Sequence, residues 1–329
     1  MMHDQFGRTI DYLRISVTDR CNFRCHYCMP EKMTFMPKTE LLSLEEIAII
    51  AERFIAHGVK KIRLTGGEPL VRRDMKQVVE RLGRHVKNGA LEELTLTTNA
   101  SLLAEHAKHL ADNGVRRINI SLDTLDPSLF ASISRGARLS DVMAGIAAAK
   151  AEGLKIKINM VALKGENETS LLPMAEYCAK QGFDLALIET MPLGAIESDR
   201  EDHYISLHDF TAPLRDLYSI VPSDFSSAGP ARYQNVEPLG LRLATITPLS
   251  HNFCDACNRI RLTTDGKIYM CLGHDAHVDL RDAVRTNGIE SVDALLKNAL
   301  RLKPLRHDFE NQMNSNAENV ERHMSVTGG

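Results

Sequence analysis

Three cysteines lie close together near the start of the chain, at Cys21, Cys25 and Cys28. They follow an apolar, strand-like run at residues 13–17 and have the spacing C-x3-C-x2-C. Three thiolates on one short loop can bind three irons of a four-iron cluster and leave the fourth iron open. An iron with an open position can bind a small molecule, so this first trio predicts a reactive metal centre.

A second trio, Cys254, Cys257 and Cys271, offers three ligands near the other end of the chain. Zinc is the alternative to a cluster here, because His274 could complete a Cys3His site. The chain has 7 cysteines, an odd number, so they cannot all form disulfides with one another. The N-terminal residues do not look secretory, and the expected compartment is the reducing cytoplasm. The seventh cysteine, Cys178, falls in a helical pattern and is expected in the core.

The composition is typical of a globular protein with one large and one smaller domain. Of the 329 residues, 43% are hydrophobic and 25% are charged, and the net charge is −3. No apolar stretch is long enough to cross a bilayer, so no membrane association is expected. Tryptophan is absent and aromatic residues make up only 5%, so nucleic acid is not an expected partner either. An anionic ligand would have to be bound by a local cluster of Lys and Arg.

Between residues 13 and 190, short β-branched runs alternate with amphipathic runs, which is the pattern of repeated β/α units. Ser43 and Glu46 have the spacing of a capping box at the start of the first helix. Right-handed crossovers between such units build a parallel sheet, either open or curled into a partial barrel. The strands are predicted at residues 13–17, 61–65, 93–98, 116–122, 155–161 and 184–189, and the helices at 44–57, 75–86, 102–113, 139–152 and 170–181.

Parallel β/α architectures bind their ligands at the C-terminal ends of the strands. The first trio follows the first predicted strand, and Gly66-Gly67-Glu68-Pro69 follows the second. Polar residues also end the later strands. The sequence therefore predicts a single active site along this rim.

After about residue 195 the alternation stops and a loop-rich passage begins. Strands are predicted at 241–246, 260–263 and 267–271, and a helix at 289–302. This part of the chain carries the second trio. We therefore divide the chain into residues 1–195, with the first trio, and a smaller domain of residues 196–329.

Several segments resemble the radical S-adenosylmethionine (SAM) GTP 3′,8-cyclase family of molybdenum-cofactor (molybdopterin) biosynthesis. They are residues 13–20, which lead into the first trio, 63–69, 119–123, 253–262 and the final Gly328-Gly329. The first trio alone indicates only the superfamily, whereas the second trio, its arginines and the double glycine are specific to the cyclases. The resemblance covers essentially the whole chain. It implies an α/β fold with a partial (β/α)6 TIM-type barrel, a smaller C-terminal GTP-binding domain and a 4Fe-4S cluster, not zinc, at the second trio.

The resemblance also assigns individual residues to ligands. The residues implied to bind SAM are Tyr27, Gly67, Glu68, Ser121 and Met191. The residues implied to bind GTP are Arg14, Arg63, Thr97, Lys157, Arg259, Ile260 and Arg261. The six cysteines of the two trios are implied to ligate two 4Fe-4S clusters, and Gly328 and Gly329 to assist catalysis.

The strand positions of three cations independently favour an anionic ligand. Arg14, Arg63 and Lys157 fall in or at the edge of three different predicted strands. A buried cation without a partner is costly, so an anion is expected beside them. A structural ion pair would also satisfy them. Ala100 stands where the family has glycine, and it would be slightly strained if that position requires a positive φ.

The resemblance implies a radical reaction with SAM as cofactor. In the family, one electron splits SAM on the open iron of the first cluster into methionine and a 5′-deoxyadenosyl radical. The radical removes the ribose 3′ hydrogen of GTP, which is held by the second cluster, and the resulting carbon radical attacks C8. The implied product is (8S)-3′,8-cyclo-7,8-dihydroguanosine 5′-triphosphate. The implied partners are an electron donor of the flavodoxin or ferredoxin type, a downstream enzyme of the molybdopterin pathway and a second copy in a homodimer.

Two other interpretations remain open from the residues themselves. One is a radical SAM enzyme that acts on a peptide and carries an auxiliary cluster. The other is a metal-bearing binding protein that catalyses no reaction.

Overall fold

The computed structural model describes residues 1–191, 193, 203–227, 229–251, 253–307, 309 and 322–328. Its strands are β1 (Met2–His3), β2 (Thr9–Ile10), β3 (Tyr12–Ser16), β4 (Lys61–Thr65), β5 (Glu93–Thr98), β6 (Arg117–Ser121), β7 (Lys155–Val161), β8 (Asp184–Ile188), β9 (Ser219–Pro222), β10 (Arg232–Glu237), β11 (Leu241–Ile246), β12 (Arg259–Leu262), β13 (Lys267–Tyr269) and β14 (His277–Asp279).

The α-helices are α1 (Leu44–Ala56), α2 (Met75–Lys87), α3 (Ala107–Asp112), α4 (Pro127–Ser134), α5 (Leu139–Ala151), α6 (Leu171–Gln181), α7 (Leu207–Phe210), α8 (Ala212–Leu217), α9 (Arg281–Asn287), α10 (Ser291–Arg301) and α12 (Met324–Thr327). The 3-10 helices are η1 (Lys38–Glu40), η2 (Pro69–Val71), η3 (Leu103–Glu105), η4 (Glu168–Ser170) and η5 (Cys254–Ala256). None of the helices in these ranges is long and apolar enough to span a bilayer.

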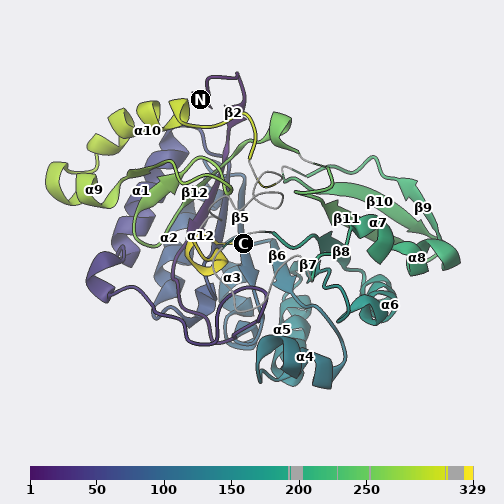
Figure 1. The fold of residues 1–329 in the computed structure, drawn as a ribbon. Coiled ribbons are helices and arrows are strands. Elements are labelled where there is room, and N and C mark those ends of the chain that lie inside the picture. The colour runs from purple at the N-terminus through teal and green to yellow at the C-terminus, as the bar shows by residue number, and fades with distance from the viewer. Residues whose placement is uncertain are drawn as a thin grey trace.

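Within the described ranges, twelve strands form one sheet in the order β14-β13-β12-β3-β4-β5-β6-β7-β8-β11-β10-β9. Strands β3 to β8 are parallel and follow one another along the chain. Strand β12 pairs parallel with β3 at one edge of this run, and β11 pairs parallel with β8 at the other. Strands from the C-terminal part of the chain thus extend the sheet at both edges. Figure 1 shows α1 to α6 outside the run of strands, with α9 and α10 beyond one end and β9 and β10 beyond the other.

The six predicted parallel strands are all present, with ends that differ from the prediction by one residue at most. The capping box is also confirmed, because Ser43 Oγ accepts from the Glu46 amide at 3.1 Å and Glu46 Oε2 accepts from the Ser43 amide at 2.7 Å. The apolar stripe of α1 contributes Ile47, Ile50 and Phe54 to the core, where all three are fully buried. Periodicity therefore located these units correctly, since each helix buries one face against the sheet.

The prediction of one helix over residues 102–113 is wrong. The segment forms the short η3 and then α3, with a break at His106. The physical reason lies in α5, where Gly145 packs so tightly that a Cβ there would lie 2.0 Å from the Ala100 carbonyl oxygen and 3.0 Å from Leu103 Cβ. This close contact fixes the turn before η3 and prevents a regular helix from starting at residue 102.

Ala100 adopts φ +64°, so it lies in the left-handed region that favours glycine. We expect Ala100→Gly to raise the free energy of unfolding by about 1 kcal/mol, because the left-handed conformation costs a residue with a Cβ about that much. Ala90→Gly is the matched control, since Ala90 is a loop residue without a positive φ, and it should be neutral or destabilising. Urea unfolding of the three proteins tests this, and an Ala100→Gly protein no more stable than the parent would contradict it.

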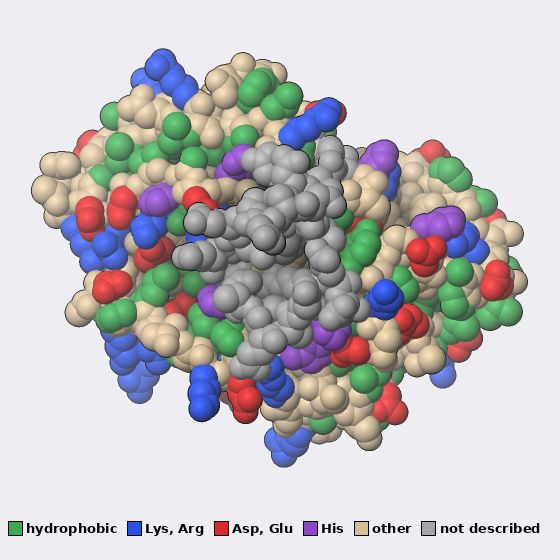
Figure 2. All heavy atoms as spheres, viewed as in Figure 1, with side chains coloured by type: hydrophobic (Ala, Val, Ile, Leu, Met, Phe, Trp, Pro, Cys, Tyr) green, Lys and Arg blue, Asp and Glu red, His purple; other side chains and the backbone are tan. Residues whose placement is uncertain are grey.

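On the face of the molecule shown in Figure 2, acidic and basic side chains are interspersed. This distribution agrees with the small net charge of −3. Among the described residues, a cluster of buried cations without carboxylate partners lies instead within the strands of the sheet, at Arg14, Arg63 and Lys157.

Candidate active site

One cavity brings together residues from every parallel strand of the sheet. Side chains of β3, β4, β5, β6, β7, β8, β11 and β12 all line it, together with the loops that carry the two cysteine trios. The predicted site residues on its wall are Arg14, Tyr27, Cys28, Arg63, Gly67, Thr97, Ser121, Met191, Cys254, Cys257, Arg259, Arg261 and Cys271. These predicted residues from different strands and loops therefore lie around one cavity, and that they form a single active site stays a prediction.

The loop of the first trio lies directly against the double-glycine loop after β4. The Gly67 amide donates to the Thr18 carbonyl at 2.8 Å, and the Glu68 amide donates to the Arg20 carbonyl at 2.9 Å. Gly66 has φ +149°, and a Cβ on either glycine would lie within 2.4 Å of a backbone oxygen of the trio loop. Only glycine permits this approach, so the motif sets the position of the cysteine loop.

Glu68 is almost fully buried and does not line the cavity. Its carboxylate accepts hydrogen bonds from the Leu70 amide at 3.0 Å, Thr98 Oγ1 at 2.8 Å and the Asn99 amide at 2.6 Å. Burial nevertheless raises the pKa of Glu68 to about 7. In this structure Glu68 joins the double-glycine loop to the end of β5, and the predicted contact with the SAM ammonium stays a prediction.

Tyr27 is held in place by a carboxylate at the end of β6. Its hydroxyl donates to Asp123 Oδ2 at 2.8 Å, and Asp123 Oδ1 accepts from the Val161 amide at 2.9 Å. Burial raises the pKa of Asp123 to about 6. Ser121 and Met191 line the same cavity as Tyr27 and Gly67, so the residues expected at the SAM site, Glu68 apart, lie around one space.

The thiols of the first trio are largely buried, and Cys28 reaches the cavity wall. Burial raises the pKa of Cys21 to about 11 and the pKa of Cys25 well above its ordinary value, and the neighbouring thiols and Asp123 add to the effect at Cys25. These shifts favour the protonated thiol at Cys21 and Cys25, although the charge of Arg24 acts in the opposite direction on Cys21. A cationic metal centre would lower these pKa values and release the protons.

All three thiols of the second trio line the cavity. Cys254 starts η5, Cys257 follows it, and Cys271 follows β13. Burial raises the pKa of Cys254 and of Cys271. Burial also acts to raise the pKa of Cys257, but the cations of Arg259 and Lys303 outweigh it and lower this pKa to about 6. Cationic side chains therefore compensate part of the negative charge that a thiolate at Cys257 would carry.

His274, the fourth zinc ligand considered above, lies close to the second trio in sequence but not on the cavity wall. Its Nε2 lies 3.0 Å from the Arg306 carbonyl oxygen, a hydrogen bond that requires a proton on that nitrogen. Among the described residues, no three His, Cys, Asp or Glu side chains are gathered as ligands of a single metal ion.

Arg14, Arg63, Lys157 and Arg261 are all less than 10% exposed. No described carboxylate forms an ion pair with any of them or with Arg259, and the Nε atoms of Arg14 and Arg63 have no hydrogen-bond partner. Burial, and next the neighbouring Arg261, holds the pKa of Arg14 well below its usual range, and burial and Arg259 lower the pKa of Arg261 to about 10. The structural ion pairs considered as an alternative are therefore absent from the described part of the chain. A cluster of like charges of this kind would be stabilised by a bound anion.

Lys157 lies in a smaller cavity that shares Arg14, Arg63 and Asn159 with the main one. Its Nζ donates to Tyr233 Oη at 3.3 Å. Burial, and then the charge of Arg63, lowers the pKa of Lys157 to about 7. The ammonium therefore needs an anion to remain protonated above neutral pH.

Two further predicted GTP contacts differ in what they offer. Thr97 Oγ1 is buried without a hydrogen-bond partner on the cavity wall, as is Asn159 Oδ1, so both are available to a ligand. Ile260 is 1% exposed and its side chain belongs to the apolar core, because β12 alternates it with Arg259 and Arg261. A contact of Ile260 with a nucleotide would have to use its backbone.

The C-terminal segment reaches the site through α12. Arg261 Nη1 donates to the Gly328 carbonyl at 2.5 Å, and a Cβ on Gly328 would lie 2.2 Å from Thr65 Cγ2 at the end of β4. Gly328 has φ +73°, so glycine is required there for both space and conformation. Gly329, the other predicted catalytic residue, lies outside the described residues.

Sequence reasoning did not single out several residues at the site. Tyr12 lies under Arg14 and Arg63, with its ring 5.7 and 5.6 Å from their guanidinium carbons. His203 lines the cavity and its Nδ1 lies 2.8 Å from Glu166 Oε1. Lys303 lies behind the second trio. Tyr12 is an ordinary strand residue, and no sequence pattern marks it as part of a site. His203 and Lys303 reach the site only through long-range packing.

Two family models match successive parts of this chain. The model described as the Radical SAM superfamily matches residues 15–178, and the model described as Molybdenum Cofactor Synthesis C matches residues 183–309. Fold and site thus define a radical SAM protein.

The relatives are more specific. A GTP 3′,8-cyclase of Agrobacterium fabrum is 52% identical over 329 residues, covering 100% of this chain and 94% of the relative. A GTP 3′,8-cyclase of Rhodopseudomonas palustris strain TIE-1 is 53% identical and covers 100% of this chain and 96% of the relative. The chain belongs to the GTP 3′,8-cyclase family.

Solved structures confirm the fold alone. Streptococcus suis SuiB bound to S-adenosylmethionine has a TM-score of 0.61 and 14% identity, covering 97% of this chain and 77% of that chain. The protein anSMEcpe with bound AdoMet has a TM-score of 0.51 and 19% identity, covering 63% of this chain and 58% of that chain.

Proposed function

We propose that this protein is a radical SAM GTP 3′,8-cyclase that converts GTP to (8S)-3′,8-cyclo-7,8-dihydroguanosine 5′-triphosphate, the first step of molybdenum-cofactor biosynthesis. The observation that carries the proposal is the cluster of buried, unpaired cations in the same cavity as both cysteine trios. A triphosphate supplies the negative charge that these cations lack. The high identity to GTP 3′,8-cyclases supports the same reaction.

In this proposal Cys21, Cys25 and Cys28 would hold a 4Fe-4S cluster, and that cluster would supply the electron for the cleavage of SAM. Gly67, Ser121 and Met191 border the space beside Cys28 in which SAM would lie. The double-glycine loop supports the cysteine loop from behind. The chain's contribution is to orient the two substrates and to exclude water from them.

We infer that Cys254, Cys257 and Cys271 would hold a second 4Fe-4S cluster, which would help to hold the guanine end of GTP. All three thiols face the cavity, and His274 does not. A four-iron cluster places each cysteine on a different iron, so the thiols do not need to meet at one point as they would around zinc. The arrangement of the described residues therefore supports a cluster more than a zinc site.

The cations define where the triphosphate would lie. Arg14, Arg63 and Lys157 come from β3, β4 and β7 and line the smaller cavity, which shares Arg14 and Arg63 with the main one. Arg259 and Arg261 approach from β12, beside the second trio. In this proposal the phosphates would lie between the strands and the base near the second trio, so the ribose would face the first trio.

The strands from β3 to β8 are inferred to form a partial (β/α)6 barrel, because side chains from all six line one cavity. The division into residues 1–195 and 196–329 stays part of this proposal. The second segment supplies the second trio and Arg259 and Arg261, and also the strands β11 and β12 that flank the barrel strands.

The remaining partners are also part of the proposal. A donor of the flavodoxin or ferredoxin type delivers the electron, and a downstream enzyme of the molybdopterin pathway consumes the cyclic product. The chain forms a homodimer, which light scattering of the purified protein tests directly.

The decisive experiment is an anaerobic product assay with GTP, SAM and a reductant. We expect about eight irons and eight sulfides per reconstituted chain and 5′-deoxyadenosine formation that depends on GTP. Cys257→Ser should lose about half of the iron, because only the second trio is broken. The proposal would be refuted by a tightly held zinc in the wild-type chain, or by SAM cleavage whose rate does not depend on GTP. The absence of any SAM cleavage would identify a binding protein.

Arg261→Ala should weaken GTP binding by about 10-fold to 100-fold, the loss that follows when one hydrogen bond to a charged group is removed. Arg259→Ala should have a smaller effect, since Arg259 is only half-buried and its Nη2 already lies 3.9 Å from Cys257 Sγ. Calorimetric titration with GTP measures both. Arg116→Ala, at an exposed arginine, is the control and should bind GTP normally. Equal affinities in all three variants would argue against a GTP site beside the second trio.

A further inference from the structure

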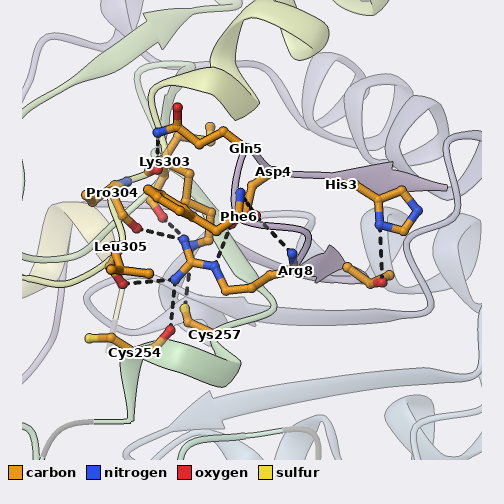
Figure 3. A network of polar contacts seen from close by, with 12 residues as sticks. His3, Asp4, Gln5, Phe6, Arg8, Cys254, Cys257, Lys303, Pro304 and Leu305 are labelled. Carbon is orange, nitrogen blue, oxygen red and sulfur yellow. Dashed lines mark hydrogen bonds and ion pairs between the residues drawn. The ribbon is translucent and has the colours of Figure 1, made fainter.

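Lys303 is a buried lysine beside the second trio (Figure 3). It follows α10 and is only 1% exposed. Its Nζ donates to the Arg259 carbonyl at 2.8 Å, the Met270 carbonyl at 2.8 Å and Cys257 Sγ at 3.5 Å. An ammonium group has three donors and no acceptor, so these contacts use all of its hydrogen-bonding capacity.

The charge of Lys303 is not balanced by a carboxylate. No Asp or Glu in the described ranges forms an ion pair with it. The neighbouring Arg8 provides the contrast, because its Nε lies 2.6 Å from Asp4 Oδ2 in a buried ion pair. The guanidinium of Arg8 also donates to the carbonyls of Cys254 at 2.8 Å and Pro304 at 2.7 Å (Figure 3).

Burying an ammonium without a counter-charge is expensive, so its counter-charge should be in contact with it. The only acceptor of Lys303 that can carry a negative charge is the sulfur of Cys257; the other two are neutral carbonyls. Asp4 is already paired with Arg8. Among the described contacts of Lys303, Cys257 is therefore the group that can supply the counter-charge.

The position of Lys303 excludes a direct role in nucleotide binding. The three thiols line the cavity, whereas Lys303 does not and lies behind them. Its two carbonyl partners belong to Arg259, at the start of β12, and Met270, immediately before Cys271. One ammonium thus joins the two backbone segments that carry Cys257 and Cys271.

We propose that Lys303 is the positioning and charge-balancing residue of the second trio, and that its hydrogen bond to Cys257 raises the reduction potential of the cluster held there. The inference rests on the second 4Fe-4S cluster of the proposed function. A reduced cluster carries one more negative charge than an oxidised one, so a nearby cation and a donor to a ligand sulfur both favour reduction. The same contacts hold the ligand geometry.

The test is a potentiometric titration of the reconstituted full-length protein, monitored by electron paramagnetic resonance. The signal of the second cluster is the one that is missing in Cys257→Ser. In Lys303→Met we expect the one-electron equilibrium of this cluster to shift at least tenfold toward the oxidised form, which is about 59 mV. Lys303→Arg, which keeps the charge, should stay near the wild-type potential. Lys297→Met removes an exposed positive charge from α10 and should change nothing.

An unchanged potential in Lys303→Met would overturn the proposal, and so would an equal shift of both clusters, which would indicate a general structural effect. If Lys303→Met binds no second cluster, the reduction potentials of this cluster in Lys303→Gln and Lys303→Arg are compared instead. Equal potentials in these two variants would also overturn the proposal, because only arginine keeps the positive charge. Zinc at the second trio of the wild-type chain would refute the cluster and this role together. Two clusters without any effect of Lys303 would refute this inference alone.

Discussion

Arg14→Met should stabilise the ligand-free protein by about 1 to 3 kcal/mol, because replacing an uncompensated buried charge with an apolar side chain of similar size removes a desolvation cost. Arg14 is 7% exposed, its Nε has no partner, and Arg261 and Arg63 both repel it. The same change should weaken GTP binding by about 10-fold to 100-fold, since a charged hydrogen bond to the nucleotide is lost. Chemical unfolding and calorimetric titration measure the two effects.

Arg8→Met is the matched control for this prediction. Arg8 is as buried as Arg14, but it is paired with Asp4 and donates to three backbone carbonyls. Its removal leaves the buried Asp4 carboxylate without its counter-charge, so we expect a loss of about 3 to 5 kcal/mol. Stability changes of the same sign in both variants would show that the charge balance of the two sites has been misassigned.

The affinity for GTP should fall as the pH rises above 7, by up to about tenfold per pH unit. The cause is Lys157, whose pKa burial lowers to about 7. Below this pH the ammonium is already present and binds the phosphates, whereas above it the protein must take up a proton when GTP binds. The groups that face Lys157 are Arg14 on β3, Arg63 on β4, Arg117 on β6, Asp184 on β8 and Tyr233 on β10.

The pH dependence is best measured between pH 7.5 and 9 at constant ionic strength, by equilibrium dialysis with labelled GTP. Arg261 keeps its charge in this range, because its pKa is lowered only to about 10. Lys157→Met should bind GTP weakly at every pH and lose the slope. A slope of the same size in Lys157→Met would assign the proton uptake to another group.

Local patterns in the sequence were sufficient to predict the units that build the site. The alternation of strands and helices gave β4, β5 and β7 with their observed ends, because each strand is buried on both faces and each helix on one. The prediction failed at residues 102–113, where contact with α5 overrides the helical periodicity. The attachment of β11 and β12 to the two edges of the parallel sheet was also not predicted, since strand pairing between distant segments leaves no periodic signal.

The sequence by itself determined which thiol and cationic groups are available to a metal or an anion, because cysteine spacing and cationic strand residues are local properties of the chain. The tertiary structure decided which charges are balanced. Nothing in the sequence distinguishes the charge of Arg8 from that of Lys303. In the fold, Arg8 forms an ion pair with Asp4, whereas Lys303 donates to two neutral carbonyls and to Cys257. Charge balance depends on which groups lie within a few ångströms of one another after water is excluded. These neighbours are fixed only when the antiparallel pair β1 and β2 and the segment after α10 pack against the second trio.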